Sequence, residues 1–137
     1  TKEKKFKVSI SEDVKKAIID SLSKDHENHL RMGYLIAKVD GLKINIMGVI
    51  VPSQDSDLTE CTVSPTEAAR ASLENYDLFA GVKEEKIFGV AIYYPALHPL
   101  IEGEITKELR RNIAIRTGFN TLSLLVNKQG KYKICQD

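Results

Sequence analysis

Residues 87–95 read Ile-Phe-Gly-Val-Ala-Ile-Tyr-Tyr-Pro, and this stretch decides the fold class. Residues 87–94 form a near-continuous apolar run, which is typical of a central strand covered on both faces. Residues 33–39 and 42–51 are two more apolar segments, and the Asp-Gly pair at 40–41 between them is a two-residue hairpin signal. The pattern predicts an antiparallel hairpin beside a buried middle strand.

A first helix is expected to begin after Ser11, which is a good N-cap residue and is followed by two acidic residues that favour the helix dipole. The apolar residues of this segment recur at helical spacing: Val14, Ala17, Ile18 and Leu22. Residues 24–28 are polar, so the helix is expected to end there, before His29 and Leu30.

Two more helices are expected after the hairpin. Residues 64–67 read Ser-Pro-Thr-Glu, a capping box that predicts a helix from Ser64 to near Gly81. The residues before it are predicted to be a loop at 53–57 and a strand at 58–63. A third helix is predicted from apolar residues at i, i+4 and i+8, closing near Gly118: Ile105, Leu109 and Ile113.

Short strands are expected at both ends of the chain. Residues 6–10 alternate between apolar and polar side chains, and residues 122–126 and 131–135 form a terminal hairpin around the turn at 127–130. With strands and helices interleaved over 137 residues, the chain is expected to form one α/β domain spanning residues 1–137.

Composition excludes several classes of protein. The sequence is 42% hydrophobic and 28% charged with a net charge of +1, which fits an ordinary globular protein and gives no bulk attraction to nucleic acid. The basic N-terminus is interpreted as a solvated tail, and it holds Lys2, Lys4, Lys5 and Lys7. No apolar run approaches the roughly 20 residues of a membrane helix, so a cytoplasmic protein is expected, although a start at Thr1 could hide a targeting segment.

Neither cysteine belongs to a metal-binding or redox pattern. Cys61 and Cys135 are far apart in the sequence and lie in no Cys-x-x-Cys or Cys/His arrangement. They are expected to be two buried thiols and not one disulfide bridge.

Two segments resemble the MPN (JAMM, Mov34/JAB) family of metalloproteases. Residues 32–37, Met-Gly-Tyr-Leu-Ile-Ala, are similar to the family's opening strand, and residues 89–95 are similar to its Gly-x-x-His-x-His-Pro strand end. The order of expected elements resembles the family over nearly the whole chain. This resemblance implies an MPN-like, cytidine-deaminase-like fold with a central mixed sheet flanked by about three helices.

In active members of that family, two histidines and an aspartate bind zinc, and a glutamate handles the proton of the metal-bound water. The glutamate, the two histidines, a serine and the aspartate fall here on Leu30 (give or take one residue), Ile92, Tyr94, Glu102 and Ile105. Isoleucine offers no lone pair, and tyrosine is a poor substitute for imidazole as a zinc ligand. The resemblance thus implies a degenerate member, with no catalytic residues, metal or cofactor.

The resemblance favours a pseudoenzyme, a pseudo-isopeptidase that acts as a scaffold by binding protein partners such as another MPN domain or a second copy of itself. The expected surfaces are the first helix, the exposed face of the second helix and residues 95–103. One alternative is a metal-assisted hydrolase with ligands relocated to His98, Glu102 and Glu104. Another is a binder of a peptide or ubiquitin-like tail, which would need an open sheet edge beside the loop after Pro95.

Other polar and aromatic residues have simpler interpretations. His26 and His29, with Glu27 between them, could share a helix face, but a solvated helix end is the preferred interpretation. The tyrosines of the second helix and the central strand, Tyr76, Tyr93 and Tyr94, are expected in the core or at an interface.

Overall fold

The computed structural model describes residues 7–57, 62–66, 85–95, 100, 103, 107–108, 110–112 and 122–136. Its elements in chain order are β1 (Lys7–Ser9), α1 (Glu12–Ser23), β2 (Arg31–Asp40), β3 (Lys43–Ile50), β4 (Gln54–Asp57), β5 (Thr62–Pro65), β6 (Glu85–Tyr94), β7 (Leu122–Asn127) and β8 (Tyr132–Gln136). A second, short helical segment includes Lys107, Glu108 and residues 110–112.

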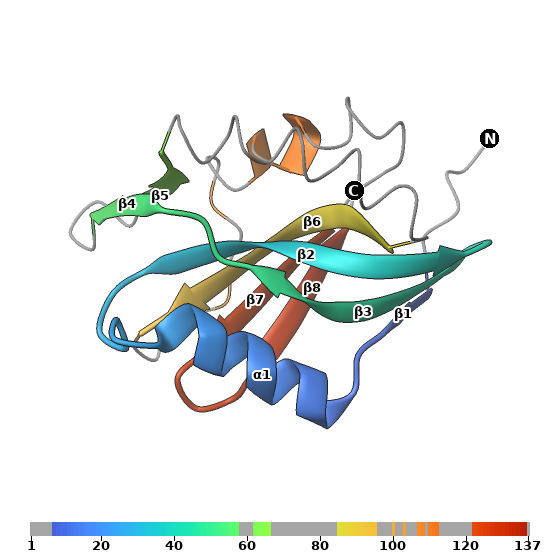
Figure 1. The fold of residues 1–137 in the computed structure, drawn as a ribbon, viewed down its shortest axis with the longest axis horizontal. Helices are drawn as coiled ribbons and strands as arrows, with labels where there is room; N and C mark the ends of the chain where they lie inside the picture. Colours follow the sequence, from blue (N-terminus) through green and yellow to red (C-terminus); the bar gives the residue numbers. More distant parts are fainter. Residues whose placement is uncertain are drawn as a thin grey trace.

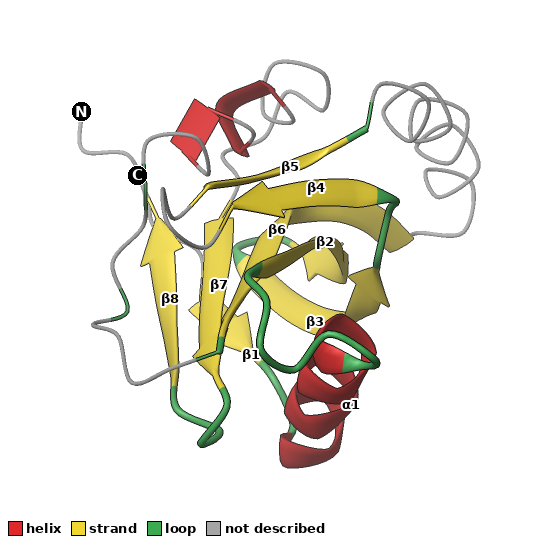
Figure 2. Cartoon of the chain, turned by 90° about the vertical axis from the view of Figure 1, so that its left-hand side faces the viewer, coloured by secondary structure: helices red, strands yellow, loops and turns green. Residues whose placement is uncertain are grey.

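Six of the strands form one curled mixed sheet in the order β1-β3-β2-β6-β7-β8, and β4 and β5 form a separate pair (Figure 1). Strand β6 runs antiparallel to β2 on one side and parallel to β7 on the other. Helix α1 covers one face of the sheet, and the second helical segment lies over the opposite face (Figure 2). The expected α/β class and the mixed sheet with a central strand at 87–94 are confirmed.

Glycine is required in the middle of β6. Gly89 pairs with Leu122 of β7, and a Cβ atom at this position would collide with the carbonyl oxygen of Leu122. The missing side chain therefore allows the two central strands to approach each other. Their side chains fill both faces of the sheet, because residues of β6 and β7 belong to both of the buried apolar clusters.

Helix α1 begins and ends where its sequence predicts. The Ser11 side chain accepts a hydrogen bond from the Val14 backbone N–H at 3.2 Å, which confirms the N-cap. Ile18 and Leu22 are buried against the sheet, whereas Ala17 is exposed, so its expected place on the inner face is wrong. Ile19, like Val14, is half-buried and packs against this cluster.

Both expected hairpins are present. In the first, Asp40 pairs with Lys43, so the turn residues are Gly41 and Leu42, one position later than the Asp-Gly signal suggested. Gly41 has a φ of 59°, which a glycine adopts without strain. In the second, the Asn127 side chain accepts hydrogen bonds from the backbone N–H groups of residues 129 and 131, both at 3.0 Å.

The region before the expected second helix differs from its prediction. Gln54–Asp57 is strand β4 and not a loop, and the second strand begins at Thr62 and continues through Pro65. Ser64 and Pro65 are therefore strand residues, and the predicted helix start at Ser64 is wrong. Pairing with β4 requires an extended backbone, and a residue before proline already favours that conformation. Residues 67–84, which carry the rest of the predicted helix, lie outside the described residues.

The second helical segment overlaps the predicted third helix, although Ile105, Leu109 and Ile113 lie outside the described residues. Its notable residue is Arg110, whose side chain is only 2% exposed. No helix within the described part of the chain combines the length and the apolar character that crossing a bilayer requires.

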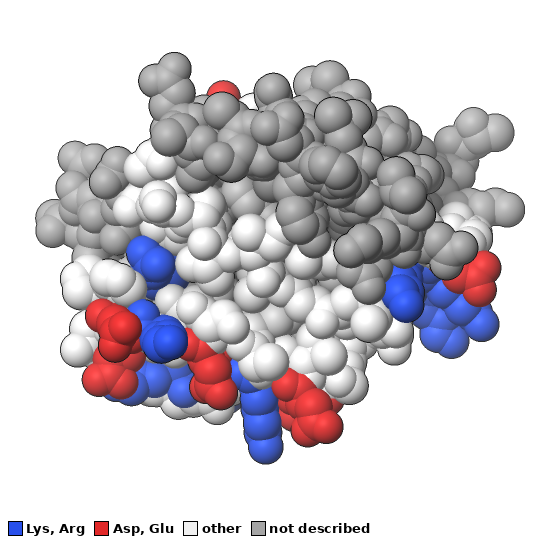
Figure 3. Space-filling model, viewed as in Figure 1, with Lys and Arg blue, Asp and Glu red and all other residues white. Residues whose placement is uncertain are grey.

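Charged side chains are unevenly distributed on the face seen in Figure 1. They gather along α1 and at the two ends of β2 and β3, and an uncharged surface lies between them (Figure 3).

Candidate functional site

Three of the five positions that the family resemblance singled out come together at one end of the sheet. Leu30 directly precedes β2, and the register of Arg31 with Tyr93 brings it beside the end of β6. Leu30 is 4% exposed and Ile92 is 1% exposed, while Tyr94 is half-buried. All three belong to one apolar cluster, which also contains Met32, Tyr34, Ile87, Val90 and Leu125. Glu102 and Ile105 lie outside the described residues.

This cluster has the properties of a hydrophobic core. Each fully buried aliphatic side chain of this size contributes about 1.5–3 kcal/mol to folding, so Leu30 and Ile92 stabilise the end of the sheet. A neutral polar side chain in either place would have to be desolvated, at a cost of about 1–3 kcal/mol without a hydrogen-bond partner, and a charged side chain would cost far more. Among the described residues no group of three or more histidines, cysteines or acidic residues is arranged to hold a metal ion.

Gln54 closes the edge of β2 next to this cluster. Pairing between β3 and β2 stops at Ile50 with Tyr34, and the next bonding position of β3 would be Pro52, which has no N–H to donate. The Gln54 side chain takes its place: it accepts from the Met32 N–H at 2.7 Å and donates to the Met32 carbonyl at 2.9 Å. It also donates to the Pro52 carbonyl at 2.9 Å. One amide side chain thus replaces a missing strand partner.

The alternative function, binding of a peptide or ubiquitin-like tail, requires an open sheet edge near Tyr94. Tyr94 pairs with Asn127 of β7 on one side, and Tyr93 pairs with Arg31 of β2 on the other. The end of β6 is therefore flanked by strands on both sides and offers no open sheet edge just before Pro95. Residues 96–99 of the following loop, including His98 of the relocated-ligand alternative, lie outside the described residues, as does Glu104.

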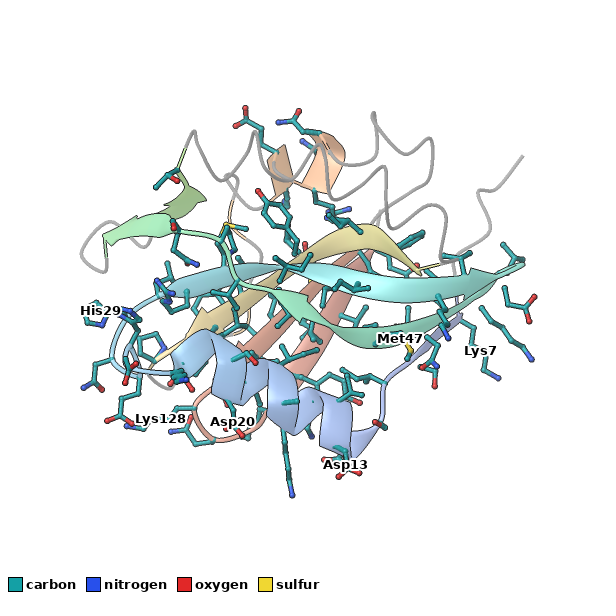
Figure 4. All side chains as sticks on the ribbon, in the orientation of Figure 1. Lys7, Asp13, Asp20, His29, Met47 and Lys128 are labelled. Atoms are coloured by element: carbon teal, nitrogen blue, oxygen red, sulfur yellow. The ribbon has the colours of Figure 1, made fainter. Side chains whose placement is uncertain are left out.

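The loop between α1 and β2 carries the two neighbouring histidines. Their rings meet edge to face with centroids 5.5 Å apart, and both side chains are exposed at the end of the molecule where Figure 4 labels His29. Asp20 and residues 23–29 line a surface depression of about 670 Å³, and each of these residues is polar or charged. His26 and His29 are thus solvated loop residues, in line with the preferred interpretation.

Two side chains of the sheet, Tyr93 and Arg31, bind this loop and the end of α1. The Tyr93 hydroxyl donates to the Glu27 carbonyl at 2.8 Å, and the Tyr93 side chain is 1% exposed, so the expectation of a core tyrosine is confirmed. Burial, and secondarily the Glu27 charge, raises the pKa of Tyr93 above its ordinary value, which keeps the hydroxyl in its donating form. The Arg31 Nε donates to the Leu22 carbonyl at 3.3 Å, next to the negative end of α1, and burial lowers the pKa of Arg31.

The remaining residues considered in the sequence analysis are the two cysteines and Tyr76. Cys135 forms no disulfide bridge and is only half-buried, at the border of the same apolar cluster, so the expectation of a buried thiol is wrong for it. Cys61 and Tyr76 lie outside the described residues.

No family model matches this chain, and a search of the curated proteins finds no match.

Sequence reasoning does not single out two residues, Gln54 next to the cluster and Arg110 in the second helical segment. Gln54 was placed in a loop, and the signal that could have revealed it is the proline that ends β3 two residues earlier. Arg110 was passed over because long charged side chains are almost never fully buried unless they are paired; it does have an interaction partner in the structure.

Proposed function

We propose that this chain is a non-catalytic, MPN-like domain that works by binding other proteins. The observation that carries the proposal is the convergence of Leu30, Ile92 and Tyr94. The resemblance assigned these positions from two segments about 60 residues apart, and the register of β2 with β6 brings them to one end of the sheet. A chance match of common residues gives no reason for such a convergence.

The chain is proposed to be non-catalytic because of the side chains that stand at the positions of the family's zinc site. An active site of this kind needs imidazole and carboxylate ligands that are open to water, whereas Leu30 and Ile92 are buried in an apolar cluster. Of the three side chains at these positions only that of Tyr94 carries an oxygen, and Tyr94 already has an interaction partner.

The binding part of the proposal draws on the surface. The outer side of α1 is largely polar, with Asp13, Lys16, Asp20 and Ser21 exposed, so α1 offers no apolar patch for a partner. The exposed large apolar side chains among the described residues are Leu42, Met47 and Tyr132, and two of these lie on or beside β3. The β3 side of the sheet is therefore the better-supported contact surface. A cytoplasmic location stays a prediction.

Metal content tests the proposal. The purified chain is incubated with excess zinc, dialysed and assayed for zinc per chain, beside a His98→Ala variant. We expect substoichiometric zinc in both. About one zinc per chain in the unmodified protein, lost in His98→Ala, would contradict the proposal and support the relocated-ligand hydrolase.

A further inference from the structure

The loop between α1 and β2 places two of the chain's three histidines in contact. The rings of His26 and His29 meet edge to face, with centroids 5.5 Å apart and ring planes at 82°. Among the described residues, neither imidazole takes part in a hydrogen bond or an ion pair. Both side chains are exposed, and Figure 4 shows His29 at the outer edge of this end of the molecule. The ring nitrogens can therefore turn towards a ligand that both rings share.

The backbone of the loop holds the two histidines at a fixed spacing. The His26 N–H donates to the Ser23 carbonyl at 2.8 Å, and the His29 N–H donates to the His26 carbonyl at 2.9 Å. Between the two histidines, the Glu27 carbonyl accepts the hydroxyl of buried Tyr93 at 2.8 Å. Because the backbone is already ordered, a ligand that binds both rings has to immobilise only the two side chains.

The separation of the two rings fits two ligands of one metal ion. With metal–nitrogen bonds of about 2.0–2.1 Å, two imidazoles on one ion have ring centroids roughly 4.5–5.5 Å apart. The observed separation of 5.5 Å lies at the upper end of this range. Neutral imidazole is the commonest metal ligand of proteins, and it suits nickel, copper and zinc ions.

The depression around the pair determines how tightly an ion can be held. Its lining carries the carboxylates of Asp20, Asp25 and Glu27 beside the ammonium of Lys24. No three histidines, cysteines or acidic residues in the described part of the chain are arranged to hold an ion together. The pair is thus a two-ligand site at which water fills the other positions. Such binding is weak and reversible, so dialysis removes the ion and the zinc assay of the proposed function is unaffected.

We propose that His26 and His29 together bind one divalent ion of a late first-row transition metal. Carboxylate and carbonyl oxygens suit magnesium and calcium, whereas imidazole nitrogen selects nickel, copper or zinc. The two rings therefore set both the place and the chemical class of the ion. This metal site is independent of the proposed MPN-like function, because it uses neither Ile92 nor Tyr94.

Titration with nickel(II), followed by NMR, tests the proposal. Nickel(II) is paramagnetic and broadens the signals of nearby nuclei, and it does not oxidise a thiol such as that of Cys135. We expect the ring signals of His26 and His29 and the amide signals of residues 23–31 to broaden first. Excess magnesium(II) should leave this broadening unchanged, because it competes for carboxylates and not for imidazole.

His26→Asn and His29→Asn each remove one imidazole and keep a polar side chain in an exposed loop. Even groups that only support a metal ligand contribute about 10–100-fold to metal affinity, so loss of a ligand itself should weaken nickel(II) binding at least tenfold. The amide spectrum of each variant checks that its fold is unchanged.

The matched control is His98→Asn, which removes the third histidine and should leave the nickel(II) titration unchanged. Broadening that does not begin at residues 23–31, that survives His26→Asn/His29→Asn, or that magnesium(II) suppresses would overturn the inference. Binding that is lost in His98→Asn would also overturn it and would support the relocated-ligand hydrolase. Failure at His26 and His29 without any effect of His98→Asn leaves the proposed function standing.

Discussion

Tyr93 and Tyr94 are neighbours in the sequence but lie on opposite faces of β6, and their surroundings differ. Tyr93 is buried in the cluster beneath α1, and its hydroxyl holds the loop after that helix. Tyr94 is half-buried at the border of the other cluster, beside Leu30 and Ile92. Packing accounts for the first residue completely. The second stands at a position where the proposed MPN-like fold would place a zinc ligand, and here that position borders an apolar cluster.

The largest effect is expected from a change that disturbs both faces at once. Gly89→Ala places a methyl group against the Leu122 carbonyl, and that group is backbone, so β6 and β7 must separate. We expect a loss of more than about 4 kcal/mol of unfolding free energy, measured by denaturant titration.

Gly48→Ala is the matched control, because a Cβ atom at Gly48 meets nothing within 4 Å. Its unfolding free energy should stay within about 1 kcal/mol of the unmodified protein. If Gly89→Ala and Gly48→Ala had equal unfolding free energies, the close approach of β6 and β7 at Gly89 would not matter for stability.

The face of the sheet beneath α1, which holds Tyr93, is predicted from the sequence better than the opposite face, which holds Tyr94. The Ser11 N-cap and the spacing of Ile18 and Leu22 are local signals, and the apolar run at 87–94 identified the central strand. Ser64 also carries a local helix signal, but the pairing of β5 with β4, the preceding strand, overrides it. The role of Gln54 depends on the register at which Pro52 meets Met32, so it could be found only in three dimensions.

A medium effect is expected when the Tyr94 side of the sheet alone is disturbed. Gln54→Ala removes the hydrogen bonds to both backbone groups of Met32, which should cost about 1–3 kcal/mol of unfolding free energy. The amide of Met32 should then exchange with deuterated solvent about tenfold faster, as measured by NMR.

Gln129→Ala removes an equally sized amide from an exposed turn and keeps the backbone N–H that bonds to Asn127. It should leave both stability and Met32 exchange unchanged. An unchanged exchange rate at Met32 in Gln54→Ala would refute the assignment of Gln54 as the strand substitute.

The smallest effect is expected on the α1 side. Tyr93→Phe keeps the packing and removes the hydrogen bond to Glu27, which should cost about 0.5–1.5 kcal/mol near neutral pH. The raised pKa means that the unfolded chain loses the Tyr93 proton at a lower pH than the folded chain. The stabilising contribution of the protonated Tyr93 hydroxyl is therefore complete below pH 10.0, the ordinary tyrosine pKa, and is lost as the pH rises above that value.

The stability difference between the unmodified protein and Tyr93→Phe should accordingly narrow above pH 10.0, as followed by urea titrations at several pH values. Tyr132→Phe, which changes an exposed tyrosine on β8, serves as the control for the loss of a hydroxyl. A difference that stays constant across the alkaline range would argue against a buried, donating Tyr93 hydroxyl.

We propose that Leu30, Ile92 and Tyr94 mark the place of a zinc site whose ligands are absent from this chain. The most direct measurement is the zinc content and zinc-dependent thermal stability of the triple variant Ile92→His/Tyr94→His/Ile105→Asp, beside the unmodified protein. We expect about one zinc per chain in the variant, which is stabilised or folded only with zinc, and neither property in the unmodified protein. A folded variant that takes up no zinc, or an unmodified chain that binds it equally, would contradict the account.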